Sequence, residues 1–574
     1  MYKVLEAKET GKLTYMTNIN GLIIGLLHLE VTGYLKNKAQ SHTEVTAMTS
    51  PNEVTEHTSI NTQRNSRQDQ YIDNLERTDT SFSYQPDEAD IESLSRQISL
   101  RSGKEKDPFE VVFDGVDDKE DIAEDMTKFR KWVITLIIAI TSICVTMISS
   151  AWSMASENIQ QHFNISREVS VLGISLYIWG LGLGPLFLSP ISEFYGRKIT
   201  FIIGLSLCTA FQFLTAFSPN FGALIFGRFM SGFFGSCFLS IAGGTITDIF
   251  KKHEIGVPMC VYSLSPFAGP SIGPLIAGFI NHNIYWRWTF HVLIIFSGVC
   301  LLLVALFVPE TYKPVLLIKK AKRFRMATGD DRYYCALEIL QREQSVVKTC
   351  LMAPKRPLLL LLKDPMMAIL CFYTGIGLAT VYLFFIALPY IFRTVFNFSL
   401  WAQGTAFMGM LIGMTIGGST APFFQEMYNK RVAKLGKGKP EYRFYPFMIG
   451  AFVMPMGLFI LAWTAYPSLH WMGAIVGSAV FGAGVALMFQ GVFAYTADGY
   501  RLYAASAMAC NSLVRSTLAG IFPLFGYQMM VGCGVNWGVC TLAFITIILI
   551  PAPFYFYKHG ERLREKSPYA WSMD

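Results

Sequence analysis

Two arginines fall inside long apolar runs, where a permanent positive charge needs a specific environment. Arg228 lies in the run of residues 221–245 and Arg515 in the run of residues 504–528. A charged side chain at the centre of a bilayer costs about 2.5–3.5 kcal/mol on insertion scales, so each must face protein or water. Ionisable groups within spans usually serve transport, which predicts a functional Arg228; pairing with carbonyls or acids alone is the structural alternative. For Arg515 the candidate partners are carbonyls or acids such as Asp498.

A second charged constellation lies between two of the apolar runs. It places Glu193, Gly196, Arg197 and Lys198 in one short turn, and Asp248 lies at the end of a later run. Gly196 can adopt backbone conformations that residues with a side chain resist. Pairing of this cluster with Asp248 would hold one conformation closed and release it in another, which is a bistable charge latch. The alternative is a solvated loop whose bases only orient the chain.

A third group consists of glycines and prolines within one apolar run, namely Gly269, Pro270, Gly273, Pro274 and Gly278. Small residues let a neighbouring membrane helix approach closely. Proline removes a backbone donor and bends a helix. A bendable close contact between two helices suits a gate, and plain helix packing is the alternative reading.

The composition shows which elements must position these groups. Charged residues make up 16% of the 574 residues, which is below the quarter that is usual in soluble domains. Residues 1–131 are polar and charged, whereas apolar runs dominate residues 132–557. This pattern predicts an all-α polytopic membrane protein with a cytoplasmic N-terminal tail at residues 1–131.

Twelve runs are long enough for a helix to cross a bilayer. They cover residues 132–154, 169–189, 200–217, 221–245, 257–280, 289–308, 366–388, 402–424, 445–465, 471–495, 504–528 and 538–557. The order predicts two six-helix halves, at 132–308 and 366–557, a central cytoplasmic loop at 309–365 and a C-terminal tail at 558–574. Two parallel repeats of this kind bind substrate near the midplane between the halves and alternate access by rocking.

The basic residues indicate an orientation. They gather before the first run, in alternate loops, in the central loop and after the last run. The positive-inside rule then places both termini in the cytoplasm. The sequons at Asn164 and Asn397 fall on the opposite side, where glycosylation is expected. A net charge of +7 distributed in this way does not indicate nucleic-acid binding.

Several other classes of site find no support in the sequence. The eleven cysteines are scattered without a CxxC pair or a histidine cluster, so neither a disulfide framework nor a metal site is predicted. The sequence lacks the GxxxxGK[ST] loop of a phosphate-loop ATPase. Residues 41–108 are polar enough to be disordered. The apolar patch at 21–35 is too short to span and could form an interfacial or regulatory helix or a locally ordered patch.

These motifs also carry a family resemblance. The segment Pro190–Lys198 resembles the loop motif between the second and third spans of the major facilitator superfamily, with Glu193 where the family usually has Asp. Arg228–Gly235 is similar to the mid-helix arginine motif of that family, and Gly269–Gly278 resembles the motif of its drug:proton antiporter branch. Similarity to the fungal twelve-span branch and the yeast multidrug-resistance facilitators lies in Trp286–Phe290, Pro309–Tyr312, Lys319–Asp331, Tyr503–Ala507, Asn511, Arg515 and Phe522–Phe525. The resemblance covers roughly residues 110–567.

The resemblance implies a transporter and not an enzyme. It implies export of small lipophilic drugs and toxins, such as azoles, cycloheximide or benomyl-like compounds, from a fungal cell in exchange for protons. The proton gradient drives such export, so no cofactor is expected; the implied partners are substrates, protons and membrane lipids, with the chain acting as a monomer. Arg228 and Asp248 would take part in proton coupling, and the glycine–proline helix would seal the cavity. The plasma membrane is the expected location, and the vacuolar membrane is the alternative.

Aromatic and amide residues in the later runs, with one tryptophan in the first, could line an apolar cavity that binds varied lipophilic molecules by area and stacking. The candidates are Trp152, Tyr382, Phe385, Gln490, Asn511 and Arg515. No carboxylate lies clearly within a span of the first half, so the proton carrier stays unassigned. A facilitator for a polyamine, sugar derivative or organic acid and a transporter-like sensor are the alternatives; a polyamine carrier would want more acids than the runs contain.

Overall fold

The computed structural model describes residues 109–111, 113, 126–250, 254–335, 338, 346–435, 438–500, 503–565, 567 and 569–570. These residues are almost wholly helical, and among them the one β pairing is an isolated parallel bridge between Glu110 and Tyr334. Most of the N-terminal tail, including the apolar patch at residues 21–35, lies outside the described residues. The predicted all-α membrane fold is confirmed.

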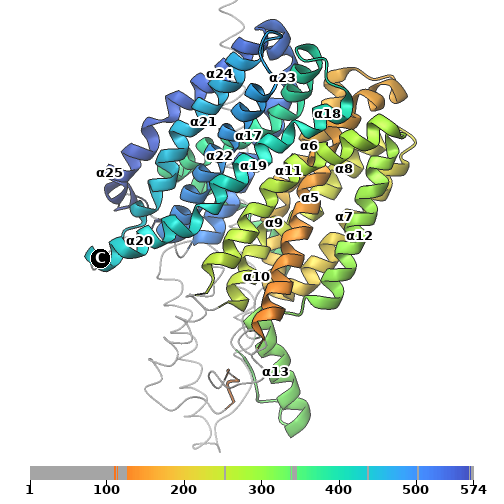
Figure 1. Cartoon of the computed structure of the whole chain (residues 1–574). Coiled ribbons are helices and arrows are strands. Elements are labelled where there is room, and N and C mark those ends of the chain that lie inside the picture. The colour runs from red at the N-terminus through yellow and green to blue at the C-terminus, as the bar shows by residue number, and fades with distance from the viewer. Residues whose placement is uncertain are drawn as a thin grey trace, which may run out of the picture. The chain divides into compact units, whose positions relative to one another are not determined.

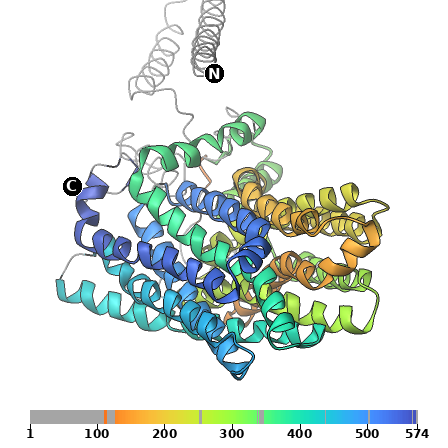
Figure 2. The same ribbon diagram turned by 90° about the horizontal axis from the view of Figure 1, so that it is seen from above.

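The helices form two bundles that lie side by side (Figures 1 and 2). The first bundle contains α5 (Lys128–Phe163), α6 (Arg167–Tyr195), α7 (Arg197–Phe217), α8 (Phe221–Gly235), α9 (Cys237–Ser240), α10 (Ala242–Ile249), α11 (Gly256–Asn283) and α12 (Arg287–Phe307). The second bundle contains α17 (Pro365–Thr394), α18 (Leu400–Thr405), α19 (Phe407–Ser419), α20 (Ala421–Leu435), η1 (Pro440–Phe444), α21 (Tyr445–Thr464), α22 (Met472–Gly499), α23 (Ala504–Gly532), α24 (Val535–Leu549) and α25 (Pro551–Glu565).

Eleven helices of the described chain are long and apolar enough to cross a membrane. Helix α23 is not among them, although its 29 residues exceed the length of a span. Polar residues such as Asn511, Arg515 and Ser516 lower its hydropathy. It nevertheless packs against α17 and α6, so the segment that the sequence predicts as the eleventh of twelve spans is a helix of the second bundle.

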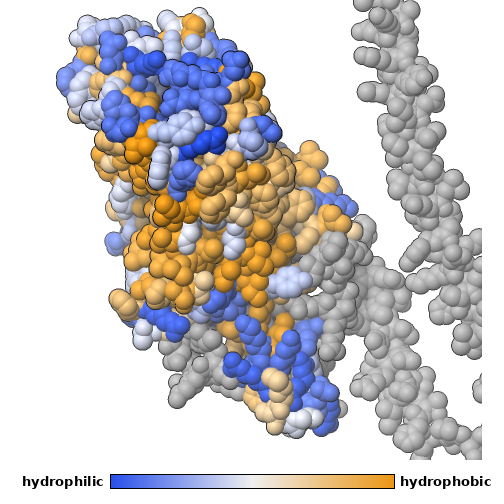
Figure 3. Space-filling view, turned by 90° about the vertical axis from the view of Figure 1, so that its right-hand side faces the viewer, coloured by the Kyte–Doolittle hydropathy of each residue, from blue (hydrophilic) through white to orange (hydrophobic). Residues whose placement is uncertain are grey.

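The outer surface explains why so many apolar residues remain exposed. On the face that Figure 3 shows, an apolar band covers the helices between two polar ends. On α12, Ile295, Val299, Leu302 and Leu306 are all exposed, and their spacing of three and four residues places them on one helical face. A lipid bilayer would cover such a face, whereas water would not stabilise it.

The two ends of the bundles differ in chemistry. One end, called here the basic end, carries the turn at Gly196 and the segment η1 with Arg443. The other end carries the turns that follow α5 and α17. In each of these turns an exposed asparagine has a positive φ angle, 49° at Asn164 and 54° at Asn397. The two sequons therefore occupy matching turns of the two repeats.

The two bundles meet along a seam. Helix α6 packs against α23, and α11 packs against α18 and α19. A Cβ atom built on Gly278 of α11 would lie 3.3 Å from the Cα atom of Gly404 in α18, so the two backbones are in close contact. The hydroxyl groups of Ser149 in α5 and Tyr382 in α17 lie 3.1 Å apart and bridge the seam.

Between the bundles the chain forms α13 (Lys313–Thr328), α15 (Val346–Met352) and α16 (Lys355–Lys363). Helix α13 contains the basic residues Lys319, Lys320, Lys322, Arg323 and Arg325 of this loop. The residues before α5 join this loop, because Val111 donates its backbone N–H to the carbonyl of Tyr334 at 2.9 Å and Tyr334 donates to Phe109 at 3.0 Å. The start of the described chain is thus tied to the central loop.

Candidate functional site

Arg228 is fully buried in α8 and well supplied with acceptors. Its Nε donates to the carbonyl of Gly173 at 2.9 Å, Nη1 to that of Ile148 at 2.7 Å and Nη2 to that of Ser149 at 3.2 Å. These carbonyls belong to α5 and α6, so the guanidinium joins three helices of the first bundle. The side chain makes hydrogen bonds to carbonyls alone among the described residues, which is the pairing that the structural alternative predicts.

Aromatic rings complete the surroundings of Arg228. Its Cζ lies 4.6 Å from the ring centre of Tyr177 and 5.1 Å from that of Trp152. The Trp152 indole N–H donates to the carbonyl of Ser170 at 3.0 Å, and the side chain has no exposed surface. A Cβ on Gly173 would collide with this indole. Trp152 therefore packs inside the first bundle, beside the arginine.

Arg515 of α23 has different surroundings. Its Nε is buried and has no hydrogen-bond partner among the described residues. Its Cζ lies 5.5 Å from the ring centres of both Phe489 and Phe493 in α22. The expected pairing with Asp498 is wrong, because Asp498 instead binds Arg443 at 2.8 Å.

The separation along the helices explains that correction. Arg515 lies eleven residues beyond the first residue of α23, which is about 16 Å along the helix at 1.5 Å per residue. Asp498 lies in the last turn of α22, at the basic end. The two charges therefore occupy different levels of the second bundle.

The remaining predicted cavity residues lie on α17, α22 and α23. The ring of Tyr382 meets Phe385 edge-on at 5.0 Å, and Phe385 packs against Phe407 at 5.7 Å. Asn511 donates from Nδ2 to Thr374 Oγ1 at 2.8 Å. The side-chain oxygens of Asn511 and Gln490 are buried, and neither has a hydrogen-bond partner among the described residues.

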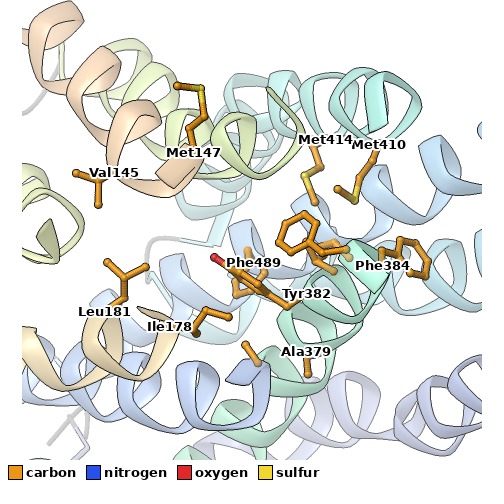
Figure 4. Close-up of a cluster of buried hydrophobic side chains, with 14 of the residues drawn as sticks. Val145, Met147, Ile178, Leu181, Ala379, Tyr382, Phe384, Met410, Met414 and Phe489 are labelled. Atoms are coloured by element: carbon orange, nitrogen blue, oxygen red, sulfur yellow. The ribbon is translucent and has the colours of Figure 1, made fainter. Parts of the chain in front are cut away.

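Apolar side chains fill the seam at this level. In Figure 4 the rings of Tyr382 and Phe489 lie together, with Ile178 and Leu181 of α6 on one side and Met410 and Met414 of α19 on the other. Phe489 also packs across the seam against Phe267 of α11, at 4.9 Å. The interior between the bundles is thus aromatic and methionine-rich.

Some of the residues of the predicted charge latch are in contact. Arg197 Nε lies 3.5 Å from Asp248 Oδ2, and its Nη1 donates to Ser192 Oγ at 3.0 Å. Gly196 has φ +99°, which a residue with a side chain rarely adopts. Lys198 donates from Nζ to the carbonyl of Ala305 at 3.1 Å rather than to Asp248. Glu193 is half-buried in the last turn of α6.

Sequence reasoning missed the central acid of this latch. Glu310, just beyond α12, is buried and accepts hydrogen bonds from the backbone N–H groups of Arg197 at 2.9 Å and Lys198 at 3.2 Å. It also accepts from its neighbours Thr311 and Tyr312 at 3.1 and 3.0 Å. An anion at a helix N-terminus is stabilising, so Glu310 pins the start of α7 to the end of α12. In the sequence, the one sign of this acid is that Pro309–Tyr312 belongs to the segments that resemble the fungal twelve-span branch.

The second bundle repeats this arrangement with other chemistry. Arg443 of η1 pairs with Asp498 at the end of α22, as Arg197 pairs with Asp248. Glu441 of η1 forms a buried ion pair with Arg564 of α25 at 2.8 Å. This pair joins the end of the last helix to the start of the third helix of the bundle. Sequence reasoning found neither pair, because it used the bases of this region only for orientation.

The glycine–proline helix α11 has two contact faces. A Cβ on Gly273 would lie 2.8 Å from the carbonyl oxygen of Met147 in α5, and one on Gly269 would lie 2.7 Å from that of Ile143. These two glycines therefore press α11 onto α5. Gly278 instead faces α18 across the seam, where its Cβ would lie 3.1 Å from the carbonyl oxygen of Leu400. Pro270 and Pro274 are buried and lie within this helix, away from its ends.

Comparison with known proteins places this geometry in context. The profile of the Major Facilitator Superfamily matches residues 134–523. The chain is 51% identical over 475 residues to a probable drug/proton antiporter, YHK8, of Saccharomyces cerevisiae, covering 82% of this chain and 92% of that protein. It is 42% identical to the efflux pump atB of Aspergillus terreus, covering 71% and 87%, and 37% identical to the multidrug transporter mdrA of Aspergillus fumigatus, covering 82% and 78%.

A solved structure shares the fold. The xylose transporter XylE of E. coli, in a partially occluded inward open conformation, aligns with a TM-score of 0.51 and 16% identity. The alignment covers 75% of this chain and 99% of XylE. At this identity the likeness concerns the arrangement of helices alone.

Proposed function

This chain belongs to the major facilitator superfamily, and from that premise we propose that it exports small, mostly lipophilic compounds across a fungal plasma membrane in exchange for protons. The observation that carries the proposal is the 51% identity, over 82% of the chain, to a protein named a probable drug/proton antiporter. Other relatives are named efflux pumps or multidrug transporters. The proposed cycle needs substrate and the proton gradient but no cofactor, and a monomer contains both bundles.

The seam supplies the kind of surface that this function needs. Tyr382, Phe385 and Phe489 offer aromatic faces, and Met410 and Met414 offer flexible, polarisable side chains. Such surfaces bind varied apolar molecules by contact area rather than by strict hydrogen bonding. Rocking of the two bundles about the seam would open it to one side at a time.

The polar groups next to the seam provide a route for coupling. Arg228 binds the carbonyl of Ser149, and the hydroxyl of Ser149 bonds across the seam to Tyr382. A change in the hydrogen bonding of Arg228 would therefore reach the second bundle through a single residue, Ser149. At the basic end, a proton placed on Asp248 would remove the charge that holds Arg197 and so release the latch.

One efflux assay tests the proposal. The chain is expressed in a yeast that lacks its own drug pumps, and loss of labelled cycloheximide is followed with and without a proton uncoupler. Uncoupler-sensitive efflux is expected, and Arg228→Ala should abolish it while surface expression persists. Unchanged drug retention beside altered uptake of a nutrient would favour a solute facilitator. Normal solute fluxes with signalling lost on deletion of the tail would favour a sensor.

A further inference from the structure

The two arginines of the interior are accommodated in opposite ways. Arg228 has three carbonyl acceptors within 3.2 Å. The side chain of Arg515 is half-buried, its Nε has no hydrogen-bond partner among the described residues, and its Cζ lies 5.5 Å from the ring centres of Phe489 and Phe493. A buried donor without an acceptor is costly, and buried charges in proteins are normally paired. The described part of the chain therefore leaves the Arg515 Nε available to an acceptor from another molecule.

Arg515 lies beside the seam where substrate would bind. Phe489, one of its two ring contacts, also packs on Phe267 of the first bundle. The residue that follows Arg515 in sequence, Ser516, abuts Gly182 of α6, and Thr517 accepts a hydrogen bond from the Trp179 indole at 3.3 Å. Helix α23 thus carries the arginine along the boundary between the bundles.

Among the residues that the structure describes, no acid forms an ion pair with Arg515. Asp and Glu residues of the described spanning helices lie in the outer turns, among them Glu157, Glu168, Glu193, Asp248 and Asp498, and Asp364 caps the start of α17. In the described part of the chain, Arg228 and Arg515 are the charged residues that lie away from the outer turns of the spanning helices. Arg515 therefore gives its side of the seam a positive charge, which disfavours a cation and favours an anion.

We infer that Arg515 binds the acidic group of the substrate and that the transported class includes lipophilic weak acids in their anionic form. This inference rests on the proposed export function and names its substrate class. A guanidinium matches a carboxylate with two parallel N–H donors. Phe489 and Phe493 would pack against the apolar body of the same molecule. The unpartnered oxygen of Gln490, next to Phe489 in sequence, would accept a hydroxyl of the substrate.

Three probes that share one apolar body test the inference. Labelled 4-phenylbutyrate, its neutral amide and the cation 4-phenylbutylamine are loaded into yeast that lacks its own drug pumps, and the efflux of each is measured. The wild-type chain is expected to export the carboxylate at least tenfold faster than the amine. Faster export of the amine, or export of cycloheximide with none of the carboxylate, would overturn the inference and leave the export function standing. Absence of uncoupler-sensitive cycloheximide efflux would instead defeat the export function itself.

Variants then assign the specificity to the arginine. Arg515→Gln should lower carboxylate efflux at least tenfold while efflux of the neutral amide stays within twofold of wild type. Arg515→Lys should restore part of the carboxylate efflux. Lys430→Gln, which removes an exposed charge on α20, serves as the matched control and should leave all three probes unchanged. Equal loss of all probes in Arg515→Gln, or unchanged carboxylate efflux, would show that the arginine does not select the acid.

Discussion

Replacing Arg515 by methionine is expected to stabilise the protein, because the Arg515 Nε is a buried donor without a partner among the described residues. Leaving such a donor unpaired costs about 1–3 kcal/mol. The contacts with Phe489 and Phe493 offset about 0.5–1 kcal/mol each. A methionine sulfur against the same rings recovers a similar amount. The expected result for Arg515→Met is a gain of about 1–2 kcal/mol in the free energy of unfolding.

The same replacement at Arg228 should have the opposite sign. It removes three hydrogen bonds from a charged donor, each of which contributes about 1.5–3 kcal/mol. Relief of the cost of burying the charge, several kcal/mol, offsets part of that loss. The ring contacts with Trp152 and Tyr177 are also lost. Arg228→Met should therefore destabilise the protein by about 2–4 kcal/mol.

Thermal unfolding of the full chain, purified in one detergent at one pH, tests both predicted changes in stability. Arg515→Met should melt above wild type, Arg228→Met below it, and the exposed Lys430→Gln with it. Carboxylate efflux should fall in Arg515→Met although stability rises, which is the trade-off expected of a residue kept for function. If Arg515→Met melts as low as Arg228→Met, the arginine has a stabilising partner and the reasoning from its unpaired donor is refuted.

Three further predictions concern the helix contacts. Gly273→Leu should reduce uncoupler-sensitive efflux at least tenfold because α11 cannot then reach α5, whereas Gly298→Leu, whose Cβ would meet nothing within 4 Å, should retain efflux; equal loss would contradict the packing argument. Glu310→Gln loses at least one charge-assisted hydrogen bond, about 1.5–3 kcal/mol, so transport rate should fall roughly tenfold in a vesicle assay; wild-type transport would exclude Glu310 from the latch. The exposed ion pair Glu157–Arg393, 2.7 Å apart, lies at the end opposite the basic end and contributes about 0.2–1 kcal/mol. Glu157→Gln should therefore change efflux less than about fivefold. A larger loss would indicate a buried gate there.

The sequence predicts the helices well and the partners of their charged residues poorly. A span is a local property, since some twenty apolar residues must cover the bilayer core, and even α23 is found despite its polar residues. The contacts of Glu310 join residues more than 110 positions apart, so no local pattern contains them. The wrong partner for Arg515 has the same origin, because both residues lie on neighbouring helices but at levels that only the packing register fixes. Trp152, predicted at the cavity, packs against Phe290 inside the first bundle for this reason as well.

Two junctions at the basic end, one in each bundle, indicate where movement can occur. In the first bundle a carboxylate at the end of α12 holds the backbone at the start of α7. In the second bundle the Arg564–Glu441 pair holds the end of α25 to the segment before α21. Different chemistry thus fixes the same junction in each repeat, between the sixth and third long helices. Because this junction is fixed in both repeats, each bundle is expected to move as a unit. The conformational change must then be taken up at the seam, where apolar contacts, few polar bonds and the unpaired Arg515 leave room for a substrate to bias it.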